Sequence, residues 1–166
     1  NFDCDDIGGD LDELIISEYV DGSGENKWIE IFNGTGNPVV LGEYANGTFT
    51  YNYFLDVYLD GNTSPTQIGL FGTILDRGVY RIAHSGATLN STNLNAQLQP
   101  FLFTIDGDDA IGLSRADNGQ TVDFIPAQPW IQDVNLVRKE TVTEGSQSGD
   151  VNEWYSYPQD TYSNLG

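Results

Sequence analysis

Basic residues are scarce in this chain. Among its 166 residues, 6 lysines and arginines stand against 25 aspartates and glutamates, which gives a formal net charge of −19. So acidic a chain repels a phosphate backbone, and it would need a local basic patch to bind nucleic acid. We therefore do not expect nucleic acid to be a partner. The surplus carboxylates suit solubility, or hard cations such as Ca²⁺.

Cysteine and methionine are almost missing. The single cysteine, Cys4, excludes an intrachain disulfide and a thiolate metal site. The lack of methionine is typical of an oxidising, extracellular setting, where both side chains are liabilities. No run of about 18 apolar residues predicts a membrane span. We expect a secreted or cell-surface location, although no signal peptide is visible in the acidic opening residues.

Glycine, aromatic and β-branched residues are abundant, and this mix favours strands and turns. Strand-like runs recur from Leu14 onward with a turn about every ten residues, and no regular amphipathic helices alternate with them. The sequence predicts an all-β sandwich or barrel with mostly antiparallel strands. We expect one domain at residues 14–166, preceded by an acidic linker or tail at residues 1–13.

The most informative stretch is a predicted β-hairpin with arms at residues 14–19 and 27–33. Glu18 and Glu30 lie near the middle of its apolar arms. If either carboxylate faces outward, it is an ordinary solvent-exposed residue. If either faces inward it needs a partner, because an unpaired buried carboxylate is costly. Arg138 is one of few bases, so we predict a structural pair between Arg138 and Glu18 or Glu30.

One tight, glycine-containing turn carries three carboxylates, Asp106, Asp108 and Asp109. Ca²⁺ takes 6–8 oxygen ligands, so this turn is a candidate calcium site. The alternative is structural, since aspartate is common in turns where it accepts hydrogen bonds from backbone amides. No cofactor is required by any other motif.

Aromatic residues offer candidate contact surfaces. Trp130 follows a proline in a loop, where we expect it to be exposed. The segment 48–59 holds Tyr51 and Tyr53 and predicts one long strand or a hairpin with an edge that pairs with another subunit. A glycan- or peptide-binding platform is the alternative use of these rings.

The residues expected of an enzyme are missing. The only histidine, His84, precedes Ser85, and neighbouring strand residues point to opposite faces. No Gly-x-Ser-x-Gly motif supplies a nucleophile. A single histidine also excludes a multi-histidine zinc site. We therefore expect a protein that is not an enzyme.

Several segments, taken in order, resemble the lamin tail domain family in its bacterial secreted branch. The opening hairpin carries Ile16, Glu18, Tyr19, Asn26, Trp28, Ile29, Glu30, Ile31 and Asn33. Later segments are Leu41 and Tyr44, residues 79–84, residues 103–111 with Gly107-Asp108-Asp109-Ala110, Asp123, residues 136–139, Trp154, Pro158, Asp160 and Leu165-Gly166. The resemblance implies an immunoglobulin-like β-sandwich, used as a module appended to secreted enzymes, nucleases among them, or to surface proteins.

Three functions follow as hypotheses. The first is an extracellular, non-catalytic interaction or structural module that binds a protein partner, assembles with its own copies or anchors a larger protein. The second is a Ca²⁺-dependent adhesion or glycan-binding domain. The third is an accessory domain of a secreted nuclease.

Overall fold

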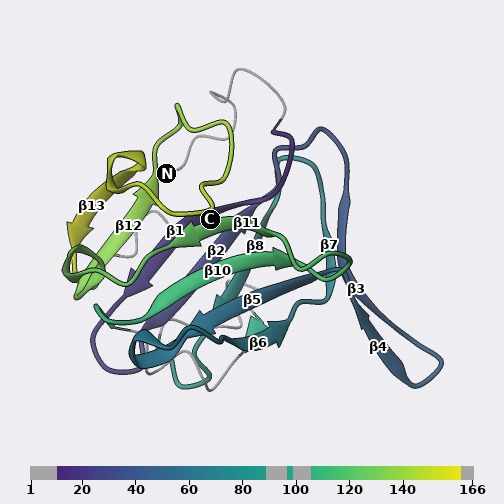
Figure 1. The fold of residues 1–166 in the computed structure, drawn as a ribbon, viewed down its shortest axis with the longest axis horizontal. Coiled ribbons are helices and arrows are strands. Elements are labelled where there is room, and N and C mark those ends of the chain that lie inside the picture. The colour runs from purple at the N-terminus through teal and green to yellow at the C-terminus, as the bar shows by residue number, and fades with distance from the viewer. Residues whose placement is uncertain (1–10, 89–96, 99–105, 162–166) are drawn as a thin grey trace.

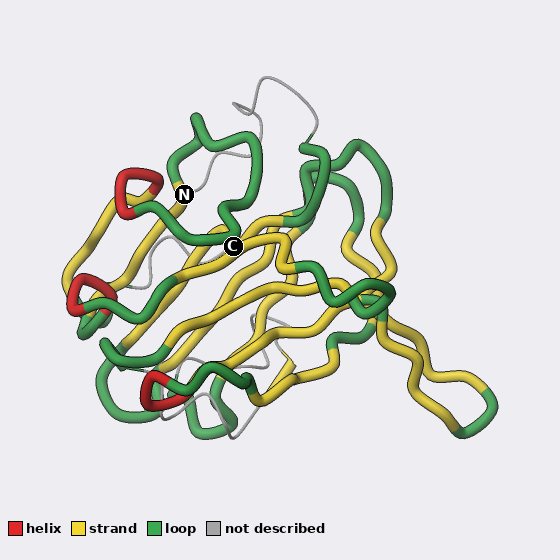
Figure 2. Tube along the Cα trace, viewed as in Figure 1, coloured by secondary structure: helices red, strands yellow, loops and turns green. Residues whose placement is uncertain are grey.

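The computed structural model describes residues 11–88, 97–98 and 106–161 (Figure 1). Cys4, and residues 103–105 and Leu165-Gly166 of the motifs that resemble lamin tail domains, lie outside these residues. In the described part of the chain, strands predominate, and no helix is both long and apolar enough to cross a membrane. Its helices are three single turns of 3₁₀ type (Figure 2), η1 (Leu59–Gly61), η3 (Pro129–Ile131) and η4 (Val151–Glu153).

Two sheets form the sandwich. The larger sheet has the order β13 (Trp154–Pro158), β12 (Val134–Arg138), β1 (Ile15–Asp21), β2 (Lys27–Phe32), β8 (Val79–Ala83) and β9 (Gln97–Leu98). The smaller sheet has the order β11 (Thr121–Ile125), β10 (Ala110–Arg115), β5 (Tyr53–Tyr58) and β6 (Thr66–Gly69). The main core draws apolar side chains from both sheets, among them Tyr19, Ile29, Leu55, Leu113 and Leu136. The predicted all-β sandwich is confirmed.

The pairing of strands is antiparallel throughout the described residues except between β8 and β9. A third, three-stranded sheet has the order β4 (Thr48–Tyr51), β3 (Val39–Ala45) and β7 (Gly72–Ile74). In Figure 1, β3 and β4 run out from the sandwich as a projecting hairpin. Asn46 and Gly47 form its two-residue turn with φ of 54° and 81°, the left-handed values that an Asn-Gly turn of type I′ requires.

The opening hairpin forms as predicted from β1 and β2. Tyr19, Ile29 and Ile31 point into the main core, so Glu18 and Glu30 point to the other face of the larger sheet. That face is also covered, because every residue of both strands is buried. Glu18 and Glu30 are therefore not solvent-exposed residues.

Arg138 does not pair with either glutamate, in contrast to the prediction. Glu18 lies opposite Val137 across the β1–β12 pair, so Arg138, the next residue of β12, points to the core side instead. There its Nη2 pairs with Asp123 of the smaller sheet, and its Nη1 lies 2.5 Å from Glu153 Oε2. The guanidinium is centred 4.0 Å above the Trp154 ring. Arg138 thus ties the two sheets together.

The two glutamates have other partners. Glu30 accepts hydrogen bonds from Ser17 Oγ at 2.9 Å and from Arg81 Nε at 3.0 Å. Glu18 accepts one from Asn135 Nδ2 at 2.8 Å. Burial, opposed by the Asn135 hydrogen bond, raises the pKa of Glu18 from 4.5 to about 8. At neutral pH the Glu18 carboxyl is therefore mostly protonated.

The domain begins earlier than residue 14. Leu11 is buried in a small cluster with Ile15 and Phe32. Glu13 accepts hydrogen bonds from the Tyr53 hydroxyl at 2.7 Å and from Arg115 Nη1 at 3.0 Å. Residues 11–13 therefore pack on the domain and do not form a linker. The acidic composition of this segment suggested a linker, but the Glu13 carboxylate binds Tyr53 and Arg115. Residues 1–10 lie outside the described residues.

Candidate functional site

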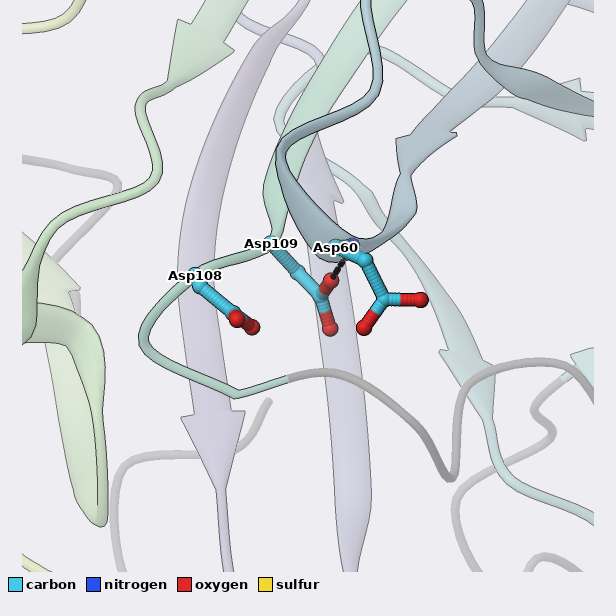
Figure 3. A group of neighbouring side chains, drawn as sticks. All are labelled: Asp60, Asp108 and Asp109. Carbon is cyan, nitrogen blue, oxygen red and sulfur yellow. Dashed lines mark hydrogen bonds between the residues drawn. The ribbon is translucent and has the colours of Figure 1, made fainter.

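An acidic cluster of Asp60, Asp108 and Asp109 joins two loops at one end of the sandwich (Figure 3). Asp60 lies in η1 after β5, and the other two precede β10. One carboxylate oxygen from each of the three lies within 4.8 Å of the others. Oxygen ligands at this spacing fit a hard cation such as Ca²⁺ better than a zinc ion, which prefers nitrogen and sulfur.

Part of this cluster has a structural task. Asp109 is buried, and its two oxygens accept hydrogen bonds from the backbone of Asp60 at 2.7 Å and of Asp106 at 3.0 Å. Burial raises the pKa of Asp109. Asp106 accepts a hydrogen bond from the backbone of Asp108 at 3.1 Å and is not one of the three converging groups.

The predicted set of Asp106, Asp108 and Asp109 is therefore replaced by one that includes Asp60. Asp60 is distant in sequence, and its left-handed backbone, with φ of 53°, turns the η1 loop toward the β10 loop. The sequence Asp60-Gly61-Asn62 predicts a turn, but it does not predict that Asp60 lies beside Asp108 and Asp109. Hydrogen bonding to Asp106 raises the pKa of the exposed Asp108 carboxyl.

The second candidate site is a row of five aromatic rings, which we call the aromatic ladder: Tyr44, Phe49, Tyr51, Phe54 and Phe71. Neighbouring ring centroids are 4.7 to 6.0 Å apart, from Tyr44 through Phe49 and Tyr51 to Phe54, with Phe71 beside Phe49. These separations are those of favourable aromatic pairs. Tyr44, Phe49 and Phe71 are exposed by 64%, 48% and 46%.

Strand register places three rings of the ladder, Tyr44, Phe49 and Tyr51, on one face of the projecting hairpin. Tyr44 pairs with Phe49 and Gly42 pairs with Tyr51, so these side chains share a face. Glu43 and Thr50 pair with each other and occupy the opposite face. Gly69 lets the Tyr51 ring lie flat against β6, since an added Cβ there would come within 2.5 Å of the ring. The inner end of the ladder is therefore held firmly while its outer rings meet solvent.

The other predicted contact aromatics lie elsewhere. Trp130 is half-buried in η3 and packs against the main core, so it is not the exposed ring that we expected. Tyr53 is buried in the same core and donates a hydrogen bond to Glu13. Of the predicted rings, only Tyr51 belongs to the ladder. Segment 48–59 divides at Asn52 into β4 and β5, which belong to different sheets. Tyr53, Leu55 and Val57 alternate along β5 and point into the main core.

His84 has a structural setting. It is buried, and its Nδ1 accepts a hydrogen bond from the backbone of Gly86 at 3.2 Å. Glu25 lies 3.9 Å from the same nitrogen. The imidazole is thus held in a turn by its own neighbours.

Neither a protein-family model nor a curated protein significantly matches this chain. The resemblance to lamin tail domains therefore rests on the quoted motifs and stays a prediction. Function has to be inferred from the acidic cluster and the aromatic ladder.

Proposed function

We propose that this domain is an extracellular, non-catalytic interaction module, and that the aromatic ladder is its contact surface. The observation that carries the proposal is the exposure of Tyr44 and Phe49 on a hairpin that projects from the sandwich, with exposed Phe71 beside Phe49. Contiguous exposed apolar rings are typical of interaction sites, where aromatic residues supply much of the binding energy.

The shape of the hairpin supports the same role. One face of the hairpin is aromatic and the other carries Glu43 and Thr50, so the hairpin is amphipathic. Among the described residues, no other element covers the outer rings of the aromatic face. The strands β4 and β7 are the edges of its sheet. A partner can therefore reach both the rings and a strand edge. Attachment to a larger secreted or surface protein, as the lamin tail resemblance implies, fits a domain whose contact surface projects.

The proposal is tested with a double variant, Tyr44→Ala with Phe49→Ala. Wild type and variant are passed over three surfaces, which carry a basic peptide, a neutral oligosaccharide and the chain itself. We expect binding to one of them that the double variant loses. Wild-type binding that the variant retains on every surface, or no binding on any, would show that the ladder is not a contact surface.

A calcium-dependent role is the second candidate, favoured by the converging oxygens of Asp60, Asp108 and Asp109. Extracellular Ca²⁺ modules bind with a Kd of about 1 mM, so about 10 mM Ca²⁺ would stabilise the native state by roughly 1.4 kcal/mol. This corresponds to a rise in Tm of about 3–6 °C for a chain of this size.

The measurement is thermal unfolding with Ca²⁺, with Mg²⁺ at equal ionic strength, and with chelator. Asp108→Asn should abolish the rise in Tm, and Glu144→Gln, which removes one exposed carboxylate outside the cluster, should preserve it. An equal Tm in Ca²⁺ and chelator would remove calcium from the account and leave these aspartates as loop-forming residues.

A further inference from the structure

The net charge of the chain indicates the kind of partner that the aromatic ladder fits. Residues 39–78, which carry all five rings, contain four acids and a single base. Three of these acids, Glu43, Asp60 and Asp76, are exposed. Glu43 lies on the opposite face of the hairpin and Asp60 lies in the acidic cluster, so the negative charge that a partner of the ladder meets is that of the whole chain, whose net charge is −19.

Five of the six bases of the chain make contacts elsewhere in the domain. Four of them are held by carboxylates within the domain: Lys27 by Asp21, Arg81 by Glu30, Arg115 by Glu13 and Asp117, and Arg138 by Asp123 and Glu153. Lys139 donates to the backbone oxygen of Asn152 at 2.7 Å. Most of the 25 acidic residues therefore have no basic residue to match them, and the field that approaching partners meet is strongly negative.

Aromatic rings elsewhere in this domain already bind cations. Arg138 lies over Trp154, Lys139 lies 5.4 Å from the Tyr155 ring centre, and Arg115 lies 6.0 Å from that of Tyr53. Within the described residues, no cation is recorded over a ring of the ladder. Tyrosine and phenylalanine faces attract lysine and arginine groups, and the attraction grows when the pair is partly desolvated.

We propose that the aromatic ladder binds a segment of a partner protein that is rich in arginine and lysine. The cationic side chains stack on the exposed rings of Tyr44, Phe49 and Phe71, and the negative field of the whole domain attracts them. This inference rests on the proposed function and names the partner class for the same surface. A second copy of the chain fits less well, because each copy carries a net charge of −19. A neutral glycan would make no use of the negative charge of the domain.

The test measures fluorescence anisotropy of a labelled ten-residue peptide of alternating arginine and serine, at low and high NaCl. Tyr44→Ala and Phe49→Ala are compared with Thr50→Ala, which lies on the opposite face of the same hairpin and also leaves the net charge unchanged. We expect the two ring variants to weaken binding about fivefold or more, and Thr50→Ala less than twofold. High salt should weaken wild-type binding several-fold.

Peptide binding that is equally strong in wild type and both ring variants would overturn the proposal, because such binding would come from the net negative charge of the domain and not from the rings. Phe71→Ala replaces either variant if thermal unfolding shows that the variant does not fold. Ladder-dependent binding of a neutral oligosaccharide or of a second copy, without peptide binding, would overturn the partner class and keep the proposed function. If the ladder binds neither the peptide nor the oligosaccharide nor a second copy, both the partner class and the proposed function are overturned.

Discussion

Replacing Arg138 with methionine is expected to lower the free energy of unfolding by roughly 3–5 kcal/mol. The Arg138 side chain is fully buried, as is that of its partner Asp123. Methionine fills much of the space but leaves the Asp123 carboxylate without its cation in a low-dielectric site. The variant also loses the hydrogen bond from Arg138 Nε to the backbone oxygen of Ile16 and the stacking on Trp154.

Urea unfolding at neutral pH measures this effect. Arg115→Met is the matched control, because the Arg115 pairs with Glu13 and Asp117 are partly exposed and should be worth less than about 1 kcal/mol each. The double variant Arg138→Met with Asp123→Asn should recover part of the loss, since asparagine removes the unpaired buried charge and its one amide oxygen can still accept from the backbone of Ser146. A loss below about 1 kcal/mol for Arg138→Met would contradict the buried ion pair.

Raising the pH is expected to destabilise the domain through Glu18. The pKa of Glu18 is about 8 in the folded chain against 4.5 as the ordinary value. Between these two values the folded state binds more protons than the unfolded state, so the free energy of unfolding falls as pH rises. The contribution of Glu18 is complete below about pH 4.5 and is lost above about pH 8. Its size is at most roughly 5 kcal/mol, from about 1.4 kcal/mol for each pKa unit.

The variant Glu18→Gln isolates this effect. Glutamine keeps an oxygen that accepts from Asn135 Nδ2, but it carries no titrating proton. We expect the variant to match wild type near pH 4.5 and to be the more stable protein at pH 8–9, by chemical unfolding at each pH. A constant difference between the two proteins from pH 4.5 to 9 would show that Glu18 ionises in the folded state as it does in the unfolded state.

The sequence predicted structure that depends on residues close together in the chain, but not contacts between residues that are far apart in it. The opening hairpin was predictable because apolar periodicity and a glycine-rich loop are local signals. The covering of both its faces was not predictable, because Glu18 and Glu30 suggest one wet face and only the tertiary structure shows both to be buried. The sequence predicted that a buried Glu18 or Glu30 would need a partner, and Arg138 was the wrong choice, because it pairs with Asp123 and Glu153. A one-residue step along β12 moves a side chain to the other face, so Arg138 points away from Glu18.

The candidate sites divide in the same way. Asp108 and Asp109 were found because they share one turn, whereas Asp60 arrives from a separate loop. The aromatic ladder was found only through Tyr51. The sequence also contains a local signal for two further rings. Asn46-Gly47, between Tyr44 and Phe49, is a strong hairpin signature, and a two-residue turn there predicts that Tyr44 and Phe49 pair across the strands. Phe71 comes from outside the hairpin, so no local pattern could have added it to the ladder.

The most direct test of the account is to locate binding on the folded domain by NMR. Amide resonances of the isotope-labelled chain are followed while the alternating arginine–serine peptide is added. We predict shifts concentrated in residues 42–51 and 69–73, which flank the aromatic ladder, with little change at Asp60, Asp108 and Asp109. Shifts that spread over the acidic loops and spare the β3–β4 hairpin would contradict the claim that the ladder is the contact surface of this domain.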